Sequence, residues 1–447
     1  MSAGQASSVA VGSLDPVRAL QHTLYRSAKA DPGRRFHALR DKVYRRDVLW
    51  RAWVRVRRNN GAPGIDETTL AEVEEYGVEK FLDELAEDLK NDRWRSRPAR
   101  RVLIPKPGSS EKRPLSIPVV RDRVVAAAVK IVLEPIFEAQ FLPCSFGFRP
   151  KRSTHDALQV LIDKSWRGNR WVVETDIANC FSAIPHEKLM QTIEERVSDQ
   201  GVLKLLRAML RAGVMADGVV RREVTGAAQG GPLSPLLCNI YLHRLDRAWD
   251  TDAHGVLVRY CDDLVVMCRS RGQAQAALER LRVLLAGLGL ECKESKTRIV
   301  ELAEGGEGVD FLGFHNRLVR GRTPRSAHLV FLARWPSRRA VQHARDRIRS
   351  ITARSRMLLP TEQLVAELNL FLRGWAGYFR YGNSALVFGQ VRNYALSRLA
   401  LLLSKRGNRR RAWGWGMARV LASPDHLGLI SLDGIVVLPR PFRAWKG

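Results

Sequence analysis

Two adjacent carboxylates, Asp262 and Asp263, lie between short apolar runs at residues 256–258 and 264–267. Two such runs separated by a polar turn predict a β-hairpin with the Asp pair at its tip. Paired hard oxygen ligands favour a metal ion there. Asp is also an ordinary turn residue, and composition alone gives about one Asp-Asp pair in a chain of this length. The pair does not decide between these interpretations, so the rest of the chain must.

The charge balance points to a polyanionic partner. The chain has 447 residues, of which 45% are hydrophobic, enough for a large core divided among several domains. Lys and Arg total 74 against 46 acids, and the net charge of +28 favours nucleic acid over a membrane. No apolar run approaches the roughly 18 residues that span a bilayer, and no signal peptide is evident. The six cysteines form no Cys-x-x-Cys pair, which predicts a reduced, cytoplasmic protein.

The N-terminal part divides into a leader and a helical extension. Residues 1–35 are rich in Ala, Ser and Gly and are predicted to be flexible. Residues 36–100 form the predicted extension, with helical patterns at 36–58 and 70–89 separated by a turn cluster at 59–66. The aromatic and Arg side chains of 36–58 fit either a docked surface helix or an arm that contacts phosphates.

Two short strands are predicted at 102–108 and 112–118, and their prolines favour edge positions. Lys106 and Arg113 at the base of this hairpin suit phosphate oxygens, although their spacing alone favours surface solubility as the explanation for both. Apolar helices are predicted at 123–137 and 154–166.

A second acid, Asp176, ends a buried-strand pattern at 171–177. A carboxylate there can bind a ligand or cap the next helix. Phe181 either floors the same site or belongs to the core. Gln229 and Gly230 begin a Gly- and Pro-rich loop before a helix at 236–245, and its glycines allow backbone to approach a base pair or phosphate closely.

The remaining pattern predicts an α+β fold followed by a basic helical region. A helix at 274–288, the Lys296 segment and a strand-like piece at 311–314 suggest a mixed sheet with helices on one face. Residues 317–447 carry 25 Lys or Arg against five acids. Helices are predicted at 337–355, 361–381 and 385–405. Four arginines at 406–411 then precede Trp413 and Trp415, a pairing of phosphate-binding groups with stacking surfaces.

In their order along the chain, Asp176, the Gln229 loop, Tyr-Cys-Asp-Asp at 260–263, Lys296 and Phe-Leu-Gly-Phe at 311–314 resemble the sequence blocks of reverse transcriptases. Segments at 60–66, 104–108, 113–118 and 372–379 are similar to group II intron-encoded reverse transcriptases, the last to their maturase, or thumb, domain. The resemblance covers about residues 40–420. It implies a right-hand polymerase with fingers and palm at 101–316, a helical thumb at 317–405 and a basic nucleic-acid-binding segment at 406–447.

The resemblance also implies roles for individual residues. Asp176 and Asp262 would bridge two Mg²⁺ ions, with Asp263 and the carbonyl of Ile177 completing the ligands. Phe181 would reject a ribose 2′-hydroxyl. The other implied nucleotide-binding residues are Lys106, Arg113, Gln229, Gly230 and Lys296. The implied primer grip comprises Phe311, Leu312, Gly313 and Phe314. The implied nucleic-acid-binding arginines are Arg373, Arg406, Arg409, Arg410 and Arg411.

By this resemblance the chain is an RNA-directed DNA polymerase that uses an RNA template, a DNA primer and dNTPs, and associates with the bacterial nucleoid during DNA synthesis. It would bind a structured RNA, a group II intron, and aid splicing and mobility. Cys261 replaces the usual Ala. No Cys pair or His-Asn-His-like cluster follows about Arg419, so an endonuclease domain is not expected and a primer would come from elsewhere, such as a replication fork.

Two alternatives remain. One is a free-standing, domesticated relative used in DNA repair, phage defence or CRISPR spacer acquisition. The other is an RNA-binding splicing cofactor without polymerase activity, against which the three intact acids argue.

Overall fold

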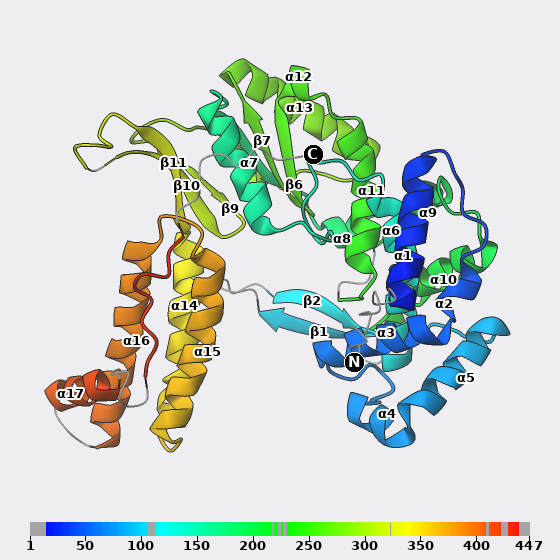
Figure 1. Cartoon of the computed structure of the whole chain (residues 1–447), viewed down its shortest axis with the longest axis horizontal. Coiled ribbons are helices and arrows are strands. Elements are labelled where there is room, and N and C mark those ends of the chain that lie inside the picture. The colour runs from blue at the N-terminus through cyan, green and yellow to red at the C-terminus, as the bar shows by residue number, and fades with distance from the viewer. Residues whose placement is uncertain are drawn as a thin grey trace, which may run out of the picture.

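The computed structural model describes residues 15–105, 112–216, 219–221, 225–226, 230–321, 323–407, 411–421 and 428–437. In Figure 1 the N-terminal helices, in blue, lie on one side of the molecule and the last helices, in orange, on the other. The sheet that carries the Asp-Asp hairpin lies between them at the top, and the β1–β2 hairpin extends from the N-terminal side toward the last helices. Among the described residues, no helix is long and apolar enough to cross a bilayer.

The chain begins with an ordered helix where a flexible leader was expected. Helix α1 spans Pro16–Ala30, with Asp15 accepting a hydrogen bond from the Val17 amide as its N-cap. Its buried side chains, Val17, Leu24 and Ala28, recur at helical spacing and belong to the same core as helix α6, Val120–Glu138. The prediction of a flexible leader is therefore wrong for residues 16–30, while residues 1–14 lie outside the described part.

The helical extension is confirmed, with breaks that turn residues explain. It contains α2 at Arg40–Val43, α3 at Arg46–Asn59, α4 at Leu70–Tyr76 and α5 at Val78–Lys90. Asn60 ends α3 in the left-handed conformation, and Gly77, at φ +100°, separates α4 from α5. Trp53 is buried beneath α3, whereas Trp50 remains 48% exposed, so only one of these two aromatics docks the helix.

The first sheet has the order β2-β1-β4-β5. Its strands are β1 at Ala99–Pro105, β2 at Lys112–Ile117, β4 at Val214–Ala216 and β5 at Val219–Arg221. The predicted hairpin is confirmed, and β2 is an edge strand. β1 is not, because its other side pairs with β4 in parallel and makes this the mixed sheet.

The Asp-Asp hairpin belongs to a second sheet, of order β6-β7-β3-β8, whose strands all pair antiparallel. The prediction of a mixed sheet is therefore wrong for the sheet that carries this hairpin. These strands are β3 at Trp171–Asp176, β6 at Val256–Tyr260, β7 at Asp263–Cys268 and β8 at Arg298–Glu301. The pattern had predicted helices on one face, but both faces are covered. Val173 and Val266 share a core with α11 at Ser234–Arg247 and α13 at Arg271–Gly287, whereas Val172 and Val265 pack with α7 at Thr154–Trp166.

Short helices complete this region. They are α8 at Cys180–Ala183, α9 at His186–Glu194, α10 at Gln200–Arg211, α12 at Thr251–His254 and the 3-10 turn at Glu294–Lys296.

The C-terminal region combines a three-stranded sheet with the predicted helices. The sheet has order β11-β10-β9, with β9 at Val309–Phe311, β10 at Phe314–Arg320 and β11 at Val330–Pro336. The three predicted helices are confirmed as α14 at Arg338–Ile351, α15 at Thr361–Phe379 and α16 at Ala385–Arg406, and α17 follows at Arg411–Leu421. Residues 311–314 form the turn between β9 and β10 instead of a strand, because Leu312 and Gly313 both have positive φ.

A buried ion pair joins the Asp-Asp hairpin to its surroundings. Arg259, on β6, is fully buried and forms a bidentate pair with Asp246 of α11 at 2.8 and 2.6 Å. Its remaining N–H groups donate to Asn239 Oδ1, to the Cys261 carbonyl and to Ser145 Oγ. One guanidinium thus connects the hairpin turn, helix α11 and the segment at 144–147.

Replacing Arg259 with Met should lower the free energy of unfolding by about 3–5 kcal/mol, because Asp246 would remain buried without a partner. Adding Asp246→Leu should recover much of that loss, since no buried charge then remains. Urea titration measures both changes. Arg282→Ala, which removes exposed pairs with Glu279 and Glu294, is the control and should cost under about 1 kcal/mol. If Arg259→Met lowers the free energy of unfolding no more than the control does, the assignment of Arg259 as the partner of a buried Asp246 charge is wrong.

Candidate active site

Strand pairing brings the separated acids together. Asp176, the last residue of β3, pairs with Asp263, the first residue of β7, so both side chains lie on one face of the sheet. The Ile177 amide donates to the Asp262 carbonyl at 3.0 Å, and the Lys293 amide donates to the Asp176 carbonyl at 2.8 Å. The backbone around all three acids is therefore held by hydrogen bonds.

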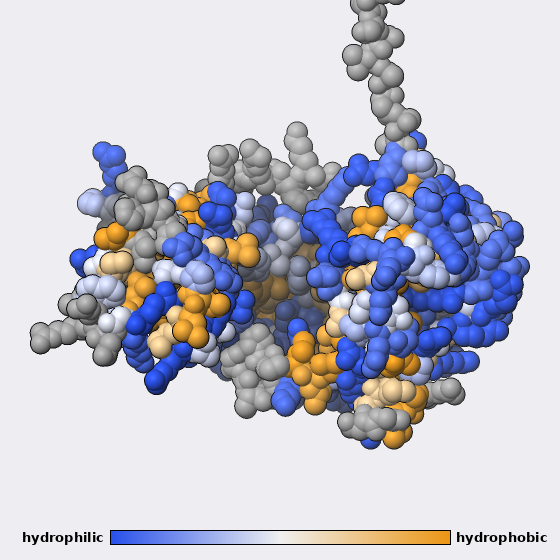
Figure 2. All heavy atoms as spheres, turned by 90° about the horizontal axis from the view of Figure 1, so that it is seen from below, coloured by the Kyte–Doolittle hydropathy of each residue, from blue (hydrophilic) through white to orange (hydrophobic). Residues whose placement is uncertain are grey.

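These acids line a cleft of about 1310 Å³ to which the N-terminal region, strand β2 and helix α14 also contribute. Figure 2, seen from below, shows the surface hollowed between two lobes. Eight of the predicted residues line the cleft: Arg113, Asp176, Ile177, Phe181, Gly230, Asp262, Asp263 and Lys296.

Negative charge within the cleft is concentrated at its three acids. Burial, followed by the charges of Asp262 and Glu174, raises the pKa of Asp263 to about 7. Burial also raises the pKa of Asp262. Lys296 forms an ion pair with Asp176. Carboxylates crowded in this way bind a cation favourably, because the cation removes their mutual repulsion.

The residues present fit Mg²⁺. No group of three or more His, Cys, Asp or Glu side chains converges as a ready-made cluster within the described ranges. Mg²⁺ usually takes only one or two carboxylates from a protein, together with substrate phosphates and waters, and Asp176 and Asp263 supply two on one face. Asp262 lines the same cleft.

The side chain of Cys261 packs away from the cleft that the acids line. It occupies the hairpin turn at φ +60°, and its thiol lies 3.6 Å from the Cys238 thiol, which is 3.6 Å from that of Cys180. All three are buried. The hydrogen bond with Cys238 and burial raise the pKa of the Cys261 thiol, so it stays protonated and uncharged beneath the catalytic turn.

The structure describes some of the residues that were predicted to contact phosphates and bases. Arg113 is exposed on β2, and Phe181 is half-buried on α8. Gly230 has φ +111°, and a Cβ there would lie 2.7 Å from Leu115, so this loop approaches β2 closely. Lys106 and Gln229 lie outside the described residues.

Two cleft residues were missed by the sequence reasoning. Phe148 is 53% exposed, has φ +56° and places its ring 6.2 Å from that of Tyr260. The neighbouring Gly147 lies so near the hairpin turn that a Cβ would stand 2.6 Å from the Cys261 nitrogen. Arg339 reaches the cleft from α14, and its charge acts on Asp263. The turn at 145–150 was the available signal for Phe148, whereas nothing distinguished Arg339 among the many arginines.

The two aromatic side chains of the predicted primer grip are buried. Phe311 and Phe314 are 4% and 0% exposed in the core shared with the last helices. Leu312 accepts a hydrogen bond from Tyr378 Oη at 2.7 Å, and Gly313 lies beside the Phe379 ring. The side chains of Phe311 and Phe314 therefore anchor the turn and are not available to contact a primer strand.

The predicted nucleic-acid-binding arginines differ in position. Arg373 is exposed on α15. Arg406 donates to Thr361 Oγ1 at 2.8 Å and to the Leu359 carbonyl at 2.7 Å, so it ties α16 to the start of α15. Arg409, Arg410 and the side chain of Arg411 lie outside the described residues.

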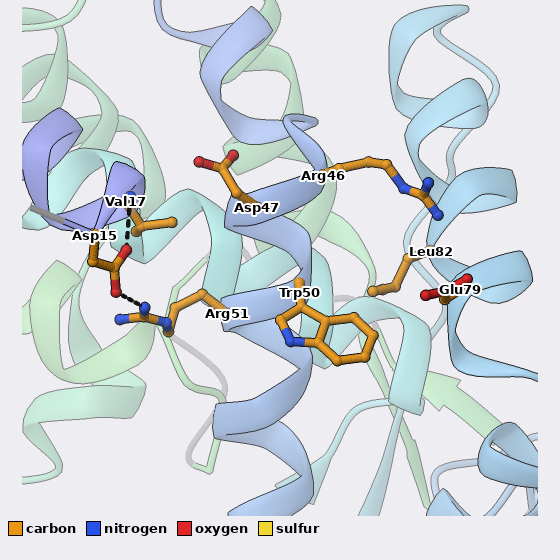
Figure 3. A pocket seen from close by; sticks show the side chains of 8 residues that line it. All are labelled: Asp15, Val17, Arg46, Asp47, Trp50, Arg51, Glu79 and Leu82. Atoms are coloured by element: carbon orange, nitrogen blue, oxygen red, sulfur yellow. Dashed lines mark hydrogen bonds and ion pairs between the residues drawn. The ribbon is translucent and has the colours of Figure 1, made fainter. Parts of the chain in front are cut away.

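A smaller hollow of about 340 Å³ lies among α1, α3 and α5 (Figure 3). Trp50 and Arg46 project from α3 toward α5, while Arg51 pairs with Asp15. Arg46 pairs with Asp83. These two arginines are matched by acids, which favours the docked-helix interpretation of α3 over a phosphate-binding arm.

Comparison with known protein families identifies two successive regions of the chain. Residues 104–316 match the family described as reverse transcriptase (RNA-dependent DNA polymerase). Residues 341–421 match the family described as group II intron, maturase-specific domain.

Three relatives illustrate the similarity. The group II intron-encoded protein LtrA of Lactococcus lactis subsp. cremoris is 35% identical over 236 residues, which cover 52% of this chain and 39% of that protein. Protein YkfC of Escherichia coli (strain K12) is 31% identical over 345 residues, which cover 68% of this chain and 88% of that protein. An uncharacterized 91 kDa protein in the cob intron of Schizosaccharomyces pombe is 36% identical over 209 residues, 46% of this chain and 25% of that protein.

The alignment thus spans under half the length of LtrA but most of YkfC. With a reverse transcriptase domain followed by a maturase-specific domain, the chain belongs to the group II intron reverse transcriptase and maturase family.

Proposed function

We propose that the chain is an RNA-directed DNA polymerase that works with a structured RNA of the group II intron class. The observation that carries this proposal is the pairing of Asp176 with Asp263 at the tip of the hairpin, inside the region that matches reverse transcriptases. The maturase-specific match supports the RNA partner. Aid to splicing and mobility would follow from that partnership.

Asp176, Asp262 and Asp263 would hold two Mg²⁺ ions, with a further oxygen from the Ile177 carbonyl. When bound, these ions would activate the primer 3′-hydroxyl and stabilise the leaving pyrophosphate. The protein's own contribution is to hold the acids in place: β3 and β7 fix Asp176 and Asp263, and Arg259 fixes the turn that carries Asp262.

Cations around the cleft would bind the triphosphate. Arg113 on β2 and Lys296 line the cleft, and Arg339 enters it from α14. In this arrangement Lys106 would act beside Arg113, and Gln229 with Gly230 would line the nascent base pair. The ring of Phe181 would lie against the sugar of the incoming nucleotide and exclude a 2′-hydroxyl.

The RNA partner would be bound through the basic C-terminal region, whose 25 Lys or Arg face only five acids over residues 317–447. Sequencing the RNA that copurifies with the protein tests this partnership. A group II intron would support it. A small guide-like RNA, or bulk RNA only, would instead favour the free-standing polymerase.

Asp263→Asn should reduce primer extension on an RNA template by roughly a thousandfold or more, because several kcal/mol of metal-dependent stabilisation would be lost. The variant should remain folded, since removing a crowded charge relieves repulsion. Asp252→Asn, on the exposed helix α12, is the matched control and should extend primers like the parent. Equal rates for the parent and Asp263→Asn would overturn the two-metal assignment.

Phe181→Val should raise the incorporation of ribonucleotides relative to deoxynucleotides by about tenfold, because it opens space beside the sugar. Phe181→Tyr keeps the ring and should preserve discrimination. Competition between dNTPs and rNTPs in primer extension measures the ratio. Unchanged discrimination in Phe181→Val would remove Phe181 from the nucleotide site.

Cys261→Ala should keep the rate of primer extension within about twofold of the parent, because the thiol packs against Cys238 and not in the cleft. The variant should lose about 1 kcal/mol of stability through lost packing. Cys268→Ala removes another buried thiol from β7 and is the control for stability. A tenfold slower rate in Cys261→Ala alone would show that the thiol acts on catalysis.

A further inference from the structure

A second large groove lies on the outer face of the β10–β11 ribbon. Its volume is about 1490 Å³, and its other walls are α14, the start of α16 and the connection from β8 to β9. None of its described lining residues lines the catalytic cleft. The groove is therefore a separate candidate site.

The alternation of β10 and β11 creates this face. Phe314, Asn316 and Leu318 are buried toward the core, so the intervening side chains point outward. The outward cross-strand pairs are His315 with Trp335, Arg317 with Ala333 and Val319 with Phe331. Two aromatic rings and an imidazole thus lie along one strand face, which gives the groove flat stacking surfaces.

The first of these pairs is held in place. The His315 and Trp335 ring centroids are 5.2 Å apart, and His315 Nδ1 lies 2.6 Å from Asp310 Oδ1. Trp335 is half-buried. A ring fixed on one side by His315 can stack with a planar group on the other side at little conformational cost.

The walls of the groove carry more basic than acidic side chains. Five arginines line the groove against two acids, Glu307 and Asp310. Arg298 and Arg320 pair with glutamates. Arg317, Arg338 and Arg345 form no ion pair within the part of the chain that the structure describes, and the buried Nε atoms of Arg317 and Arg345 have no hydrogen-bond partner there. Such arginines suit phosphate oxygens.

Flat rings on a strand face, bordered by arginines that form no ion pair with the described residues, match the chemistry of single-stranded RNA. Unpaired bases stack on aromatic side chains while arginines follow the phosphates. A duplex would fit poorly, because its bases are already stacked on one another and cannot lie on Trp335. We propose that this groove binds an unpaired stretch of RNA while the catalytic cleft holds template and primer.

This assignment rests on the proposed RNA partnership but not on the polymerase chemistry. In the test, fluorescein-labelled oligo(U) of ten nucleotides is bound to the full chain that has been saturated with an unlabelled template–primer duplex, and fluorescence anisotropy is measured. The oligomer should still bind. Its complete displacement by the duplex would overturn the proposal, because it would place the RNA in the catalytic cleft.

Trp335→Ala should weaken oligo(U) binding between about fivefold and 150-fold, as expected for the loss of one stacked base. Trp335→Phe keeps a flat ring and should stay within about threefold of the parent. Trp166→Ala, at a 46% exposed tryptophan on α7, is the matched control and should bind like the parent. Primer extension at saturating template–primer should be unchanged in all three, which separates this result from a failure of the polymerase proposal.

Because Trp335 is half-buried, its Ala variant could lose structure, and a second variant at the exposed rim keeps the test decisive. Arg338→Gln should reduce the slope of log affinity against log salt concentration by about one. If Arg338→Gln keeps the parent's slope and affinity, the groove is not an RNA site. The same holds if folded Trp335→Ala binds oligo(U) like the parent.

Discussion

The position of the three acids in the candidate active site depends on the buried Arg259–Asp246 pair. Arg259 uses all five of its N–H donors: two on Asp246 and one each on Asn239, the Cys261 carbonyl and Ser145. Burying a charge pair costs desolvation energy, which only complete hydrogen bonding offsets. Because the Cys261 carbonyl immediately precedes Asp262, the same guanidinium that satisfies Asp246 also fixes the backbone of the Asp-Asp turn.

The charge of this turn favours the binding of cations. The acids gather at the end of one sheet, where burial raises the pKa values of Asp262 and Asp263. A nucleoside triphosphate alone would be repelled by them. Divalent cations between the acids and the phosphates would remove that repulsion, and Arg113 and Arg339, on elements far apart in sequence, would neutralise what remains. The negative charges of the acids and the phosphates would therefore be neutralised only when substrate, cations and protein are together.

Sequence patterns predicted the parts of the site that local chemistry determines. The hairpin, Asp176 at the end of its strand and the long helices follow from alternation, helical spacing and turn residues. The parallel pairing of β1 with β4 was not predictable, because β4 has only three residues and its partner is more than a hundred positions away. The family resemblance implies that Phe311 and Phe314 grip a primer, yet tertiary packing buries their side chains. Helix α1 was hidden by the composition of the residues before it.

The first turn of α14 connects the two grooves. Arg338 lines the outer groove and the adjacent Arg339 lines the cleft of the three acids, so consecutive residues of one helix face two cavities. Strand β10 also contributes to two places. Phe314 packs in the core that joins the sheets to α15, and His315 lines the outer groove. If RNA in the groove shifts α14, it also moves Arg339 relative to Asp263. Linkage then requires that template, primer and nucleotide in the cleft change the affinity for that RNA by the same factor.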